Sequence, residues 1–167
     1  VQTVASIGDA GSIIAATVER RGFVVQRGGS SSRESRRTPV LKKMVEYALA
    51  HKDTGLVTGF TVDGSTGPAG ACKAGVAQFA AMTEVPVYCL RAHASRGVHL
   101  KTWDRTLIPL PFSRLSFKVA GPLEAVGDDT EDTRRSIEAA LHDLHRRSFA
   151  EYGQQPVPEL VCLDEGG

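Results

Sequence analysis

Two polar loops carry the residues whose types and spacing could do chemistry. Residues 27–33 read Arg-Gly-Gly-Ser-Ser-Ser-Arg, and residues 61–75 hold four glycines with Asp63 and Lys73 as their charged residues. Guanidinium groups bind phosphate in a bidentate manner, and glycines let a ligand approach the backbone closely. The loops therefore predict a site for an anionic ligand, with ordinary surface connections as the alternative interpretation.

Each loop stands between an apolar run and a helical pattern. The first follows a β-branched run at 23–26 and precedes apolar residues at helical spacing in 39–49. The second follows an apolar run at 56–61 and precedes a helix expected at about 74–82. Ligands of α/β proteins bind at the carboxyl ends of parallel strands, and helix N-termini offer free N–H groups to anions. We therefore expect the two loops to face each other across one sheet edge.

The remaining elements continue an alternation of strands and helices. We expect strands at 1–6, 87–90 and 115–119, and helices at about 9–21, capped by Asp9 or Ser12, and from 129 onward. The unbroken apolar run 87–90 is typical of a buried parallel strand, and 92–113 is expected to be a long irregular connection. The pattern predicts an α/β fold, with a mostly parallel central sheet and helices on both faces. Residues 1–150 are expected to form one domain, followed by a flexible tail at 151–167.

The net charge of +1 hides a strong asymmetry. Residues 14–43 hold eight Lys/Arg against two acids, residues 91–118 hold six against one, and the chain from 119 onward holds eleven acids against four bases. A basic middle region favours phosphate groups or an anionic lipid surface as the partner, with a solvated charged face as the alternative. Aromatic residues are sparse among the bases, so we expect no nucleic acid as a partner.

Several common catalytic and cofactor patterns are absent from the sequence. It contains no Gly-x-Ser-x-Gly, no P-loop, and no Gly-x-Gly-x-x-Gly after the first strand. His142 and His145 stand three apart in the expected last helix, where a polar face is more typical than a metal site, so no metal is predicted. The cysteines Cys72, Cys89 and Cys162 are odd in number and widely spaced, which favours free thiols. No run is long enough to span a bilayer, and no secretory signal is seen.

With the loops and the basic connection considered together, the chain resembles the lysophospholipid acyltransferase superfamily. It is most similar to the bacterial branch known only as a domain of unknown function. Four stretches carry the resemblance, and their order and spacing extend it over nearly all of residues 6–122: residues 14–23, 27–33, 63–76 and 101–114. The most specific stretch is Trp103-Asp104-Arg105 with Pro111-Phe112-Ser113-Arg114 after it.

The resemblance implies transfer of a fatty acyl group from a thioester carrier to a hydroxyl of a lysophospholipid or lipid A-like acceptor. A histidine acts as the general base in such enzymes. The donor substrate is acyl-CoA or acyl carrier protein, and no other cofactor is implied. The residues that match the acyl-acceptor pocket are Arg27, Gly28, Gly29, Ser30, Ser31, Ser32, Arg33, Asp63, Gly64, Ser65 and Thr66. The implied location is the cytoplasmic face of the inner membrane, either peripheral or anchored by upstream sequence.

The sequence also departs from the family pattern. The family's catalytic histidine precedes the segment at which this chain starts, so we expect the chain as given to be N-terminally incomplete, beginning at Val1 without a methionine. Asp9 lies one residue out of register with the acid that follows that histidine, Thr66 stands where arginine is usual, and Gly29 is an extra residue. A non-catalytic lipid- or phosphate-binding homologue is the main alternative, and a nucleotide- or sugar-phosphate-binding enzyme is a further one.

Overall fold

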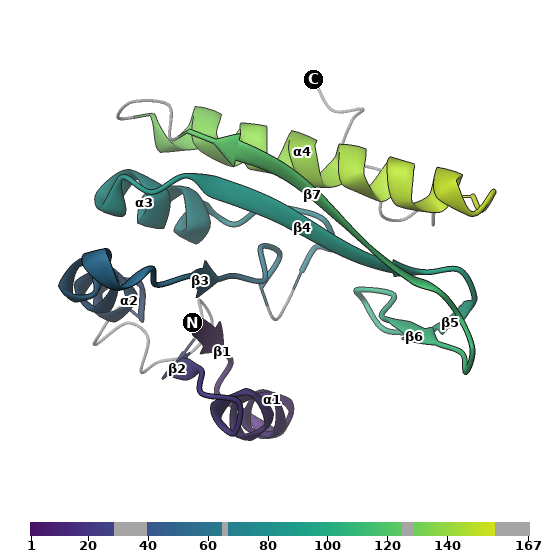
Figure 1. The fold of residues 1–167 in the computed structure, drawn as a ribbon, viewed down its shortest axis with the longest axis horizontal. Helices are drawn as coiled ribbons and strands as arrows, with labels where there is room; N and C mark the ends of the chain where they lie inside the picture. The colour runs from purple at the N-terminus through teal and green to yellow at the C-terminus, as the bar shows by residue number, and fades with distance from the viewer. Residues whose placement is uncertain (29–39, 65–66, 125–128, 156–167) are drawn as a thin grey trace. The chain divides into compact units, whose positions relative to one another are not determined.

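The computed structural model describes residues 1–28, 40–64, 67–124 and 129–155. The chain divides into two compact units, residues 1–65 and residues 66–167. Each unit has its own strands and helices (Figure 1).

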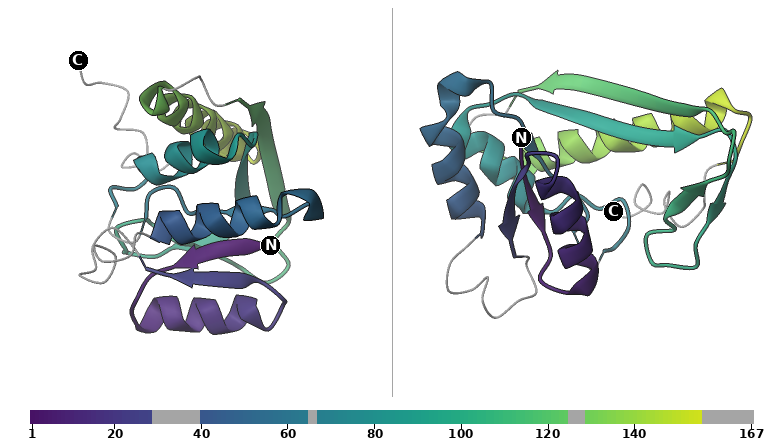
Figure 2. Two further views of the ribbon diagram at one scale, coloured as in Figure 1. Left: turned by 90° about the vertical axis from the view of Figure 1, so that its left-hand side faces the viewer. Right: turned by 60° about the horizontal axis from the view of Figure 1, so that its bottom comes forward.

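The first unit is a small parallel α/β sheet. Its elements are β1 (Gln2–Ala5), α1 (Asp9–Glu19), β2 (Val24–Arg27), α2 (Val40–Ala50), a 3-10 turn (Lys52–Thr54) and β3 (Thr58–Gly59). The strand order is β2-β1-β3, and both pairs are parallel. Right-handed crossovers from β1 outward to β2, and from β2 back past β1 to β3, place the two connecting helices on opposite faces of the sheet. Figure 2 shows α1 on one face and α2 on the other.

The core of the first unit lies between this sheet and its helices. Met44 and Val45 of α2 are buried at 1% and 5% exposure, and Ala15 of α1 is buried against the sheet. The side chain of Gln2 is fully buried, and its Nε2 donates to the carbonyl of Met44 at 3.0 Å and to Thr58 Oγ1 at 2.9 Å. One polar side chain therefore ties the first strand to α2 and β3.

The second unit is built on an antiparallel strand pair. Its elements are α3 (Ala74–Thr83), β4 (Val87–Ala94), β5 (Gly97–His99), β6 (Leu107–Pro109), β7 (Leu115–Leu123) and α4 (Thr130–Glu151). β4 pairs with β7, and β5 pairs with β6 in a hairpin. The long helix α4 packs against α3, β4 and β7, where it buries Ile137 and Leu144 at 1% and 0% exposure. Asp129 caps α4 by accepting from the backbone N–H groups of Glu131 and Asp132.

The predicted mixed α/β class is confirmed, but the expected large parallel sheet is not seen in the described residues. The parallel part is the three-stranded sheet β2-β1-β3. The run 87–90 was predicted to be a buried parallel strand, and this is wrong: β4 is antiparallel to β7, and Tyr88 and Leu90 are 60% and 61% exposed. The apolar run is continuous because both strand faces carry apolar side chains, although α4 covers only one of them.

Three smaller expectations also change. Residues 92–113 are not an irregular connection, because they contain the end of β4 and the β5–β6 hairpin. Gly8 is the N-cap of α1, so neither Asp9 nor Ser12 has that role. The predicted tail falls mostly outside the described residues, and Gln154 near its start accepts a hydrogen bond from His93 and donates one to the carbonyl of Ser95.

Candidate functional site

The carboxyl ends of the three parallel strands bring three segments of the first unit to one sheet edge. The turn from Ser6 to Gly8 follows β1, Arg27 and Gly28 end β2, and the segment 60–64 follows β3. This is the position at which open α/β sheets bind ligands. Two pairs of predicted site residues, Arg27 with Gly28 and Asp63 with Gly64, therefore lie at the same edge.

Arg27 anchors the end of β2 to the start of α1. Its Nη1 donates to the carbonyl of Gly11 at 2.9 Å, and its Nη2 donates to Ser12 Oγ at 2.9 Å. The hydroxyl of Ser12 in turn donates to the carbonyl of Gly8. Two of the five guanidinium N–H groups are used in this way. The expected bidentate phosphate contact would use the remaining N–H groups of this exposed side chain.

Tight backbone packing explains the glycines beside Arg27. A Cβ atom on Gly28 would stand 2.0 Å from Cγ2 of Val40 at the start of α2. A Cβ atom on Gly11 would stand 2.0 Å from the carbonyl oxygen of Ser6. Side chains at these two positions would push both helices away from the strand ends, so the glycines hold the first turns of α1 and α2 close to the candidate site.

Asp63 lies in a turn after β3. The backbone N–H of Gly64 donates to the carbonyl of Thr61 at 3.4 Å, and Gly64 has a φ of 70°, which favours glycine. Within the described parts of the chain, the half-buried carboxylate of Asp63 has no hydrogen-bond or ion-pair partner. As far as the described residues go, the turn thus leaves an acceptor-only group available for a ligand hydroxyl or a cationic group.

Asp9 has a simpler setting. It is the first residue of α1, it is exposed, and it follows the N-cap residue Gly8. A carboxylate in the first turn of a helix is stabilised by the helix dipole. The helix dipole is therefore enough to explain an acidic residue at position 9. Asp9 also lies at the same edge of the sheet as Arg27. The other predicted site residues, Gly29, Ser30, Ser31, Ser32, Arg33, Ser65 and Thr66, lie outside the described residues.

The glycine-rich loop continues in the second unit, where α4 occupies its polar groups. The backbone N–H of Cys72 donates to Glu138 Oε2 at 2.7 Å, and the carbonyl of Cys72 accepts from Arg134 Nη1 at 3.2 Å. Arg134 and Glu138 also pair with each other at 2.9 Å. One backbone amide of the loop, two residues before the first residue of α3, is therefore already bonded to a carboxylate of the same unit.

Two further contacts hold this loop. Lys73 Nζ donates to the carbonyl of Gly67 at 2.7 Å. The one cation of the loop therefore makes a hydrogen bond within the loop itself. Trp103 lies against Gly67, where a Cβ atom would approach Cε3 of the indole to 2.7 Å. The neighbouring Asp104 accepts from Thr106 Oγ1 at 2.6 Å, and hydrogen bonds from Thr102 and Thr106 hold the pKa of its carboxyl below the usual range. The Trp-Asp-Arg stretch thus has a packing role in the second unit.

A cluster of histidines around Phe149 was missed by the sequence reasoning. His93 and His145 have ring centroids 4.4 Å and 4.7 Å from that of Phe149, and His99 stacks on it at 6.3 Å. His145 was expected on a polar helix face, and this is wrong, because it is only 5% exposed. Burial, and then the nearby charge of Arg91, lower the pKa of His145 to about 4. The spacing of three residues between His142 and His145 does not indicate that His145 is buried.

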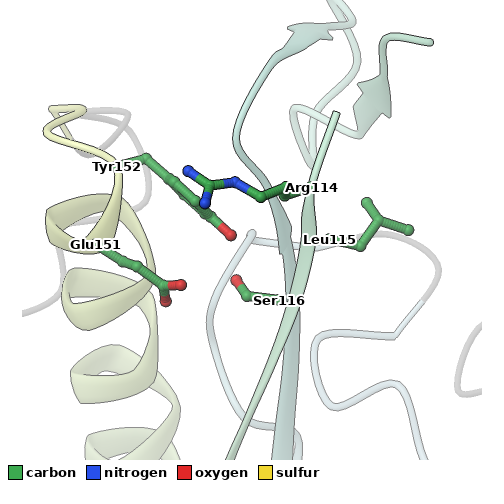
Figure 3. Close-up of a pocket in the computed structure, with 5 residues that line it drawn as sticks. All are labelled: Arg114, Leu115, Ser116, Glu151 and Tyr152. Atoms are coloured by element: carbon green, nitrogen blue, oxygen red, sulfur yellow. The ribbon is translucent and has the colours of Figure 1, made fainter. Parts of the chain in front are cut away.

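A pocket in the second unit lies between the start of β7 and the end of α4. Arg114, Leu115, Ser116, Glu151 and Tyr152 line it, with Glu151 directed toward the strand (Figure 3). Arg114 stacks over the ring of Tyr152, and Glu151 pairs with Lys118, which lowers the pKa of the Glu151 carboxyl. The charged groups of this pocket are thus matched by partners in the same unit.

The described residues contain neither a metal-binding cluster nor a membrane-spanning helix. No group of three or more His, Cys, Asp or Glu side chains in the described ranges is arranged to hold a metal ion. None of the helices in the described part of the chain is long and apolar enough to cross a membrane.

Comparison with known proteins yields one distant similarity. The chain is 31% identical over 84 residues to an uncharacterized protein of Rickettsia prowazekii (strain Madrid E). The match covers 50% of this chain and 38% of that relative, so the chain spans well under half of its length. No family model matches the chain, and no solved structure matches it.

Proposed function

We propose that the protein is an acyltransferase that moves a fatty acyl group from a thioester carrier to a hydroxyl of a lysophospholipid or lipid A-like acceptor. The observation that supports the proposal is the shared sheet edge, where Arg27 with Gly28 and Asp63 with Gly64 follow the two outer strands of one parallel sheet, on either side of β1. A cationic group and an open carboxylate at one edge suit an acceptor that carries both a phosphate and a hydroxyl.

In the proposed reaction, the acceptor hydroxyl oxygen attacks the thioester carbonyl. The new C–O ester bond forms, the C–S bond breaks, and the hydroxyl proton passes through the general base to the departing thiolate. Asp63 accepts a hydrogen bond from the acceptor and orients it, and backbone N–H groups of the turn stabilise the oxyanion. The remaining N–H groups of Arg27 bind the acceptor phosphate. The general base in this proposal is a histidine, as the resemblance implies.

The test compares this chain with the complete gene product, using lysophospholipids and lipid A-like acceptors with acyl-CoA and acyl carrier protein as donors. Mass spectrometry measures the acylated product. We expect activity from the complete gene product, loss of about 100-fold or more in Asp63→Ala, and little change in Asp53→Ala. Asp53 is the matched control because it lies in the 3-10 turn that precedes β3, away from the carboxyl edge. Full activity in Asp63→Ala would contradict the proposal.

A non-catalytic lipid- or phosphate-binding protein on the same scaffold is the second candidate. It is favoured by the placement of His51, the one histidine in the sequence of residues 1–65. His51 follows the C-terminus of α2, at the opposite end from the candidate edge, and its Nδ1 donates to the carbonyl of Tyr47. Binding of lysolipid by the folded complete gene product, without acylation from either donor, would select this candidate.

A further inference from the structure

The β5–β6 hairpin has two faces of different character. The inner face carries His99, which stacks toward Phe149, and Leu107 directly opposite it on β6. Val98 and Ile108 are opposite each other on the outer face. Because side chains alternate along a strand, this outer face continues through residues 100 and 110. The backbone bonds Leu100 N to Thr106 O, and Leu110 N to Arg96 O, extend the ladder in both directions.

The outer face is apolar and open to solvent. Val98, Leu100, Ile108 and Leu110 are 53%, 41%, 47% and 38% exposed. Figures 1 and 2 show the hairpin at the end of the β4–β7 pair that lies away from α3. Contiguous apolar side chains in the open cost free energy in water, and on a folded protein they mark a surface that binds something.

Phe112 adds the most exposed large side chain. It is 102% exposed, and it stands at the tip of a turn in which Ser113 N and Oγ both bond the carbonyl of Leu110. Its φ is 63°, a left-handed conformation that costs a non-glycine residue roughly 1 kcal/mol. The side chain of Phe112 is not buried against the described residues of the second unit, so burial there does not offset this strain. The turn therefore holds an aromatic side chain out from the protein beside the apolar face.

Positive charge borders the apolar face. Arg96 stands at the end of the hairpin beside Leu110, and Lys101 and Arg105 lie in the connection at its other end. The one acid of residues 91–118 is Asp104, which is occupied by its bonds to Thr106. An apolar strip bounded by cations and carrying an exposed aromatic is complementary to a bilayer with anionic headgroups above acyl chains.

We propose that the outer face of the β5–β6 hairpin, together with the turn at Phe112, is a docking surface that inserts into an anionic lipid bilayer. Phe112 and the four aliphatic side chains enter the boundary of the acyl chains, while Arg96, Lys101 and Arg105 remain among the headgroups. The surface rests on the proposed function for its role of bringing the protein to a lipid substrate, but docking itself requires neither a thioester nor catalysis.

The sequence contains a single tryptophan, and it lies in the connection of this hairpin. Trp103 is 47% exposed, so its fluorescence reports the polarity around the proposed surface. The test titrates the whole chain with vesicles of phosphatidylcholine alone, and with vesicles of equal parts phosphatidylcholine and phosphatidylglycerol. We expect a blue shift of Trp103 emission with the anionic vesicles, and quenching by brominated acyl chains. We also expect binding about 25-fold weaker on the neutral vesicles, from the two exposed basic side chains Arg96 and Lys101 at about fivefold each.

Matched substitutions locate the surface. Phe112→Ser is expected to weaken binding to the anionic vesicles roughly tenfold, and Lys101→Gln about fivefold. The control Phe117→Ser removes a phenylalanine that is 65% exposed in the middle of β7, outside the hairpin, and should change binding less than twofold. Circular dichroism checks that each variant is folded, as expected for exposed positions.

The results that would overturn the proposal are distinct. Trp103 emission that neither shifts nor quenches with anionic vesicles would exclude insertion of the hairpin. An equal loss of binding in Phe117→Ser and Phe112→Ser would assign binding to the β4–β7 face instead. Equal binding to neutral vesicles would remove the role of the bordering charges. Because no donor thioester is present, failure of acyl transfer leaves each of these results unaffected.

Discussion

The glycine-containing loops of the two units differ in whether their polar groups have hydrogen-bond partners. After β3, the Asp63-Gly64 turn of the first unit leaves a carboxylate without a partner among the described residues. In the second unit, Glu138 and Arg134 bond both backbone groups of Cys72, and Lys73 bonds Gly67. Glycines and charged side chains in a loop thus indicate either a ligand site or a structural clamp. The packing of neighbouring elements decides which of the two is formed.

The largest expected effect concerns the helix starts of the two units. Gly11→Ala places a Cβ atom 2.0 Å from the backbone oxygen of Ser6, which cannot move without shifting β1. We expect a loss of about 3 kcal/mol in the free energy of unfolding. Gly75→Ala at the start of α3 meets no atom within 4 Å, and should stabilise by about 0.5 kcal/mol through helix propensity. Hydrogen exchange resolved by peptide assigns each change to its unit. Equal changes of stability in Gly11→Ala and Gly75→Ala would contradict the difference expected between the two helix starts.

The clamp in the second unit is tested by Glu138→Ala. This change leaves the N–H of Cys72 and the charge of Arg134 without their shared carboxylate, and we expect a loss of about 2 kcal/mol in urea denaturation. Glu131→Ala is the matched control on the same helix, because Glu131 also pairs with Arg134. That pairing lowers the pKa of Glu131 to about 2, but solvent screens this exposed pair, so the control should have the smaller effect. A larger loss of stability in Glu131→Ala than in Glu138→Ala would show that the loop is not held by Glu138.

The histidine cluster predicts a pH dependence of the second unit. The pKa of His145 is lowered from 6.5 to about 4 in the fold, so between these values the unfolded chain binds more protons. Stability therefore falls as the pH is lowered from about 6.5 to about 4. The shift corresponds to at most about 3 kcal/mol, which solvent screening reduces to about 2 kcal/mol. His145→Phe removes the titrating group from beside Phe149, and unfolding curves should depend less on pH in this range while matching at pH 8. An unchanged slope would exclude His145 as its source.

The smallest effect on stability is expected at the open site. Asp63→Asn keeps the shape of the side chain and removes its charge, and no partner among the described residues is lost. We expect the free energy of unfolding to change by less than about 0.5 kcal/mol, with acyl transfer lost as in Asp63→Ala. A loss of stability comparable to that of Glu138→Ala would show that Asp63 belongs to a structural clamp, and the contrast between the units would then disappear.

The helices were predictable because their patterns are local. Met44 and Val45 of α2, and Ile137 and Leu144 of α4, belong to apolar patterns with helical spacing and are among the buried residues of those helices. The strand partners were not predictable in the same way. An apolar run such as 87–90 does not state whether both strand faces are covered, and β4 has two large side chains exposed on one face. The hairpin was missed because seven residues, 100–106, join its strands without a glycine turn.

The candidate site was predictable only in outline. Parallel strands end at one edge, so the order of strands and loops was enough to bring Arg27 and Asp63 to the same edge. The partners of the two side chains were not encoded in any short pattern. The bonds of Arg27 to Gly11 and Ser12 depend on the close approach of α1, and the carboxylate on Cys72 comes from a residue 66 positions away.

The buried amide of Gln2 has a consequence for the order in which the chain folds. Its partners lie 42 and 56 residues along the sequence, in α2 and β3. Closing loops of these lengths costs chain entropy before any contact repays it, and parallel pairing of distant strands slows folding. The β1-α1-β2 segment can form over a shorter loop. The central strand β1, in contrast, gains its second neighbour only when β3, which contains Thr58, pairs with it. Mutations at Gln2 should therefore speed unfolding much more than they slow folding.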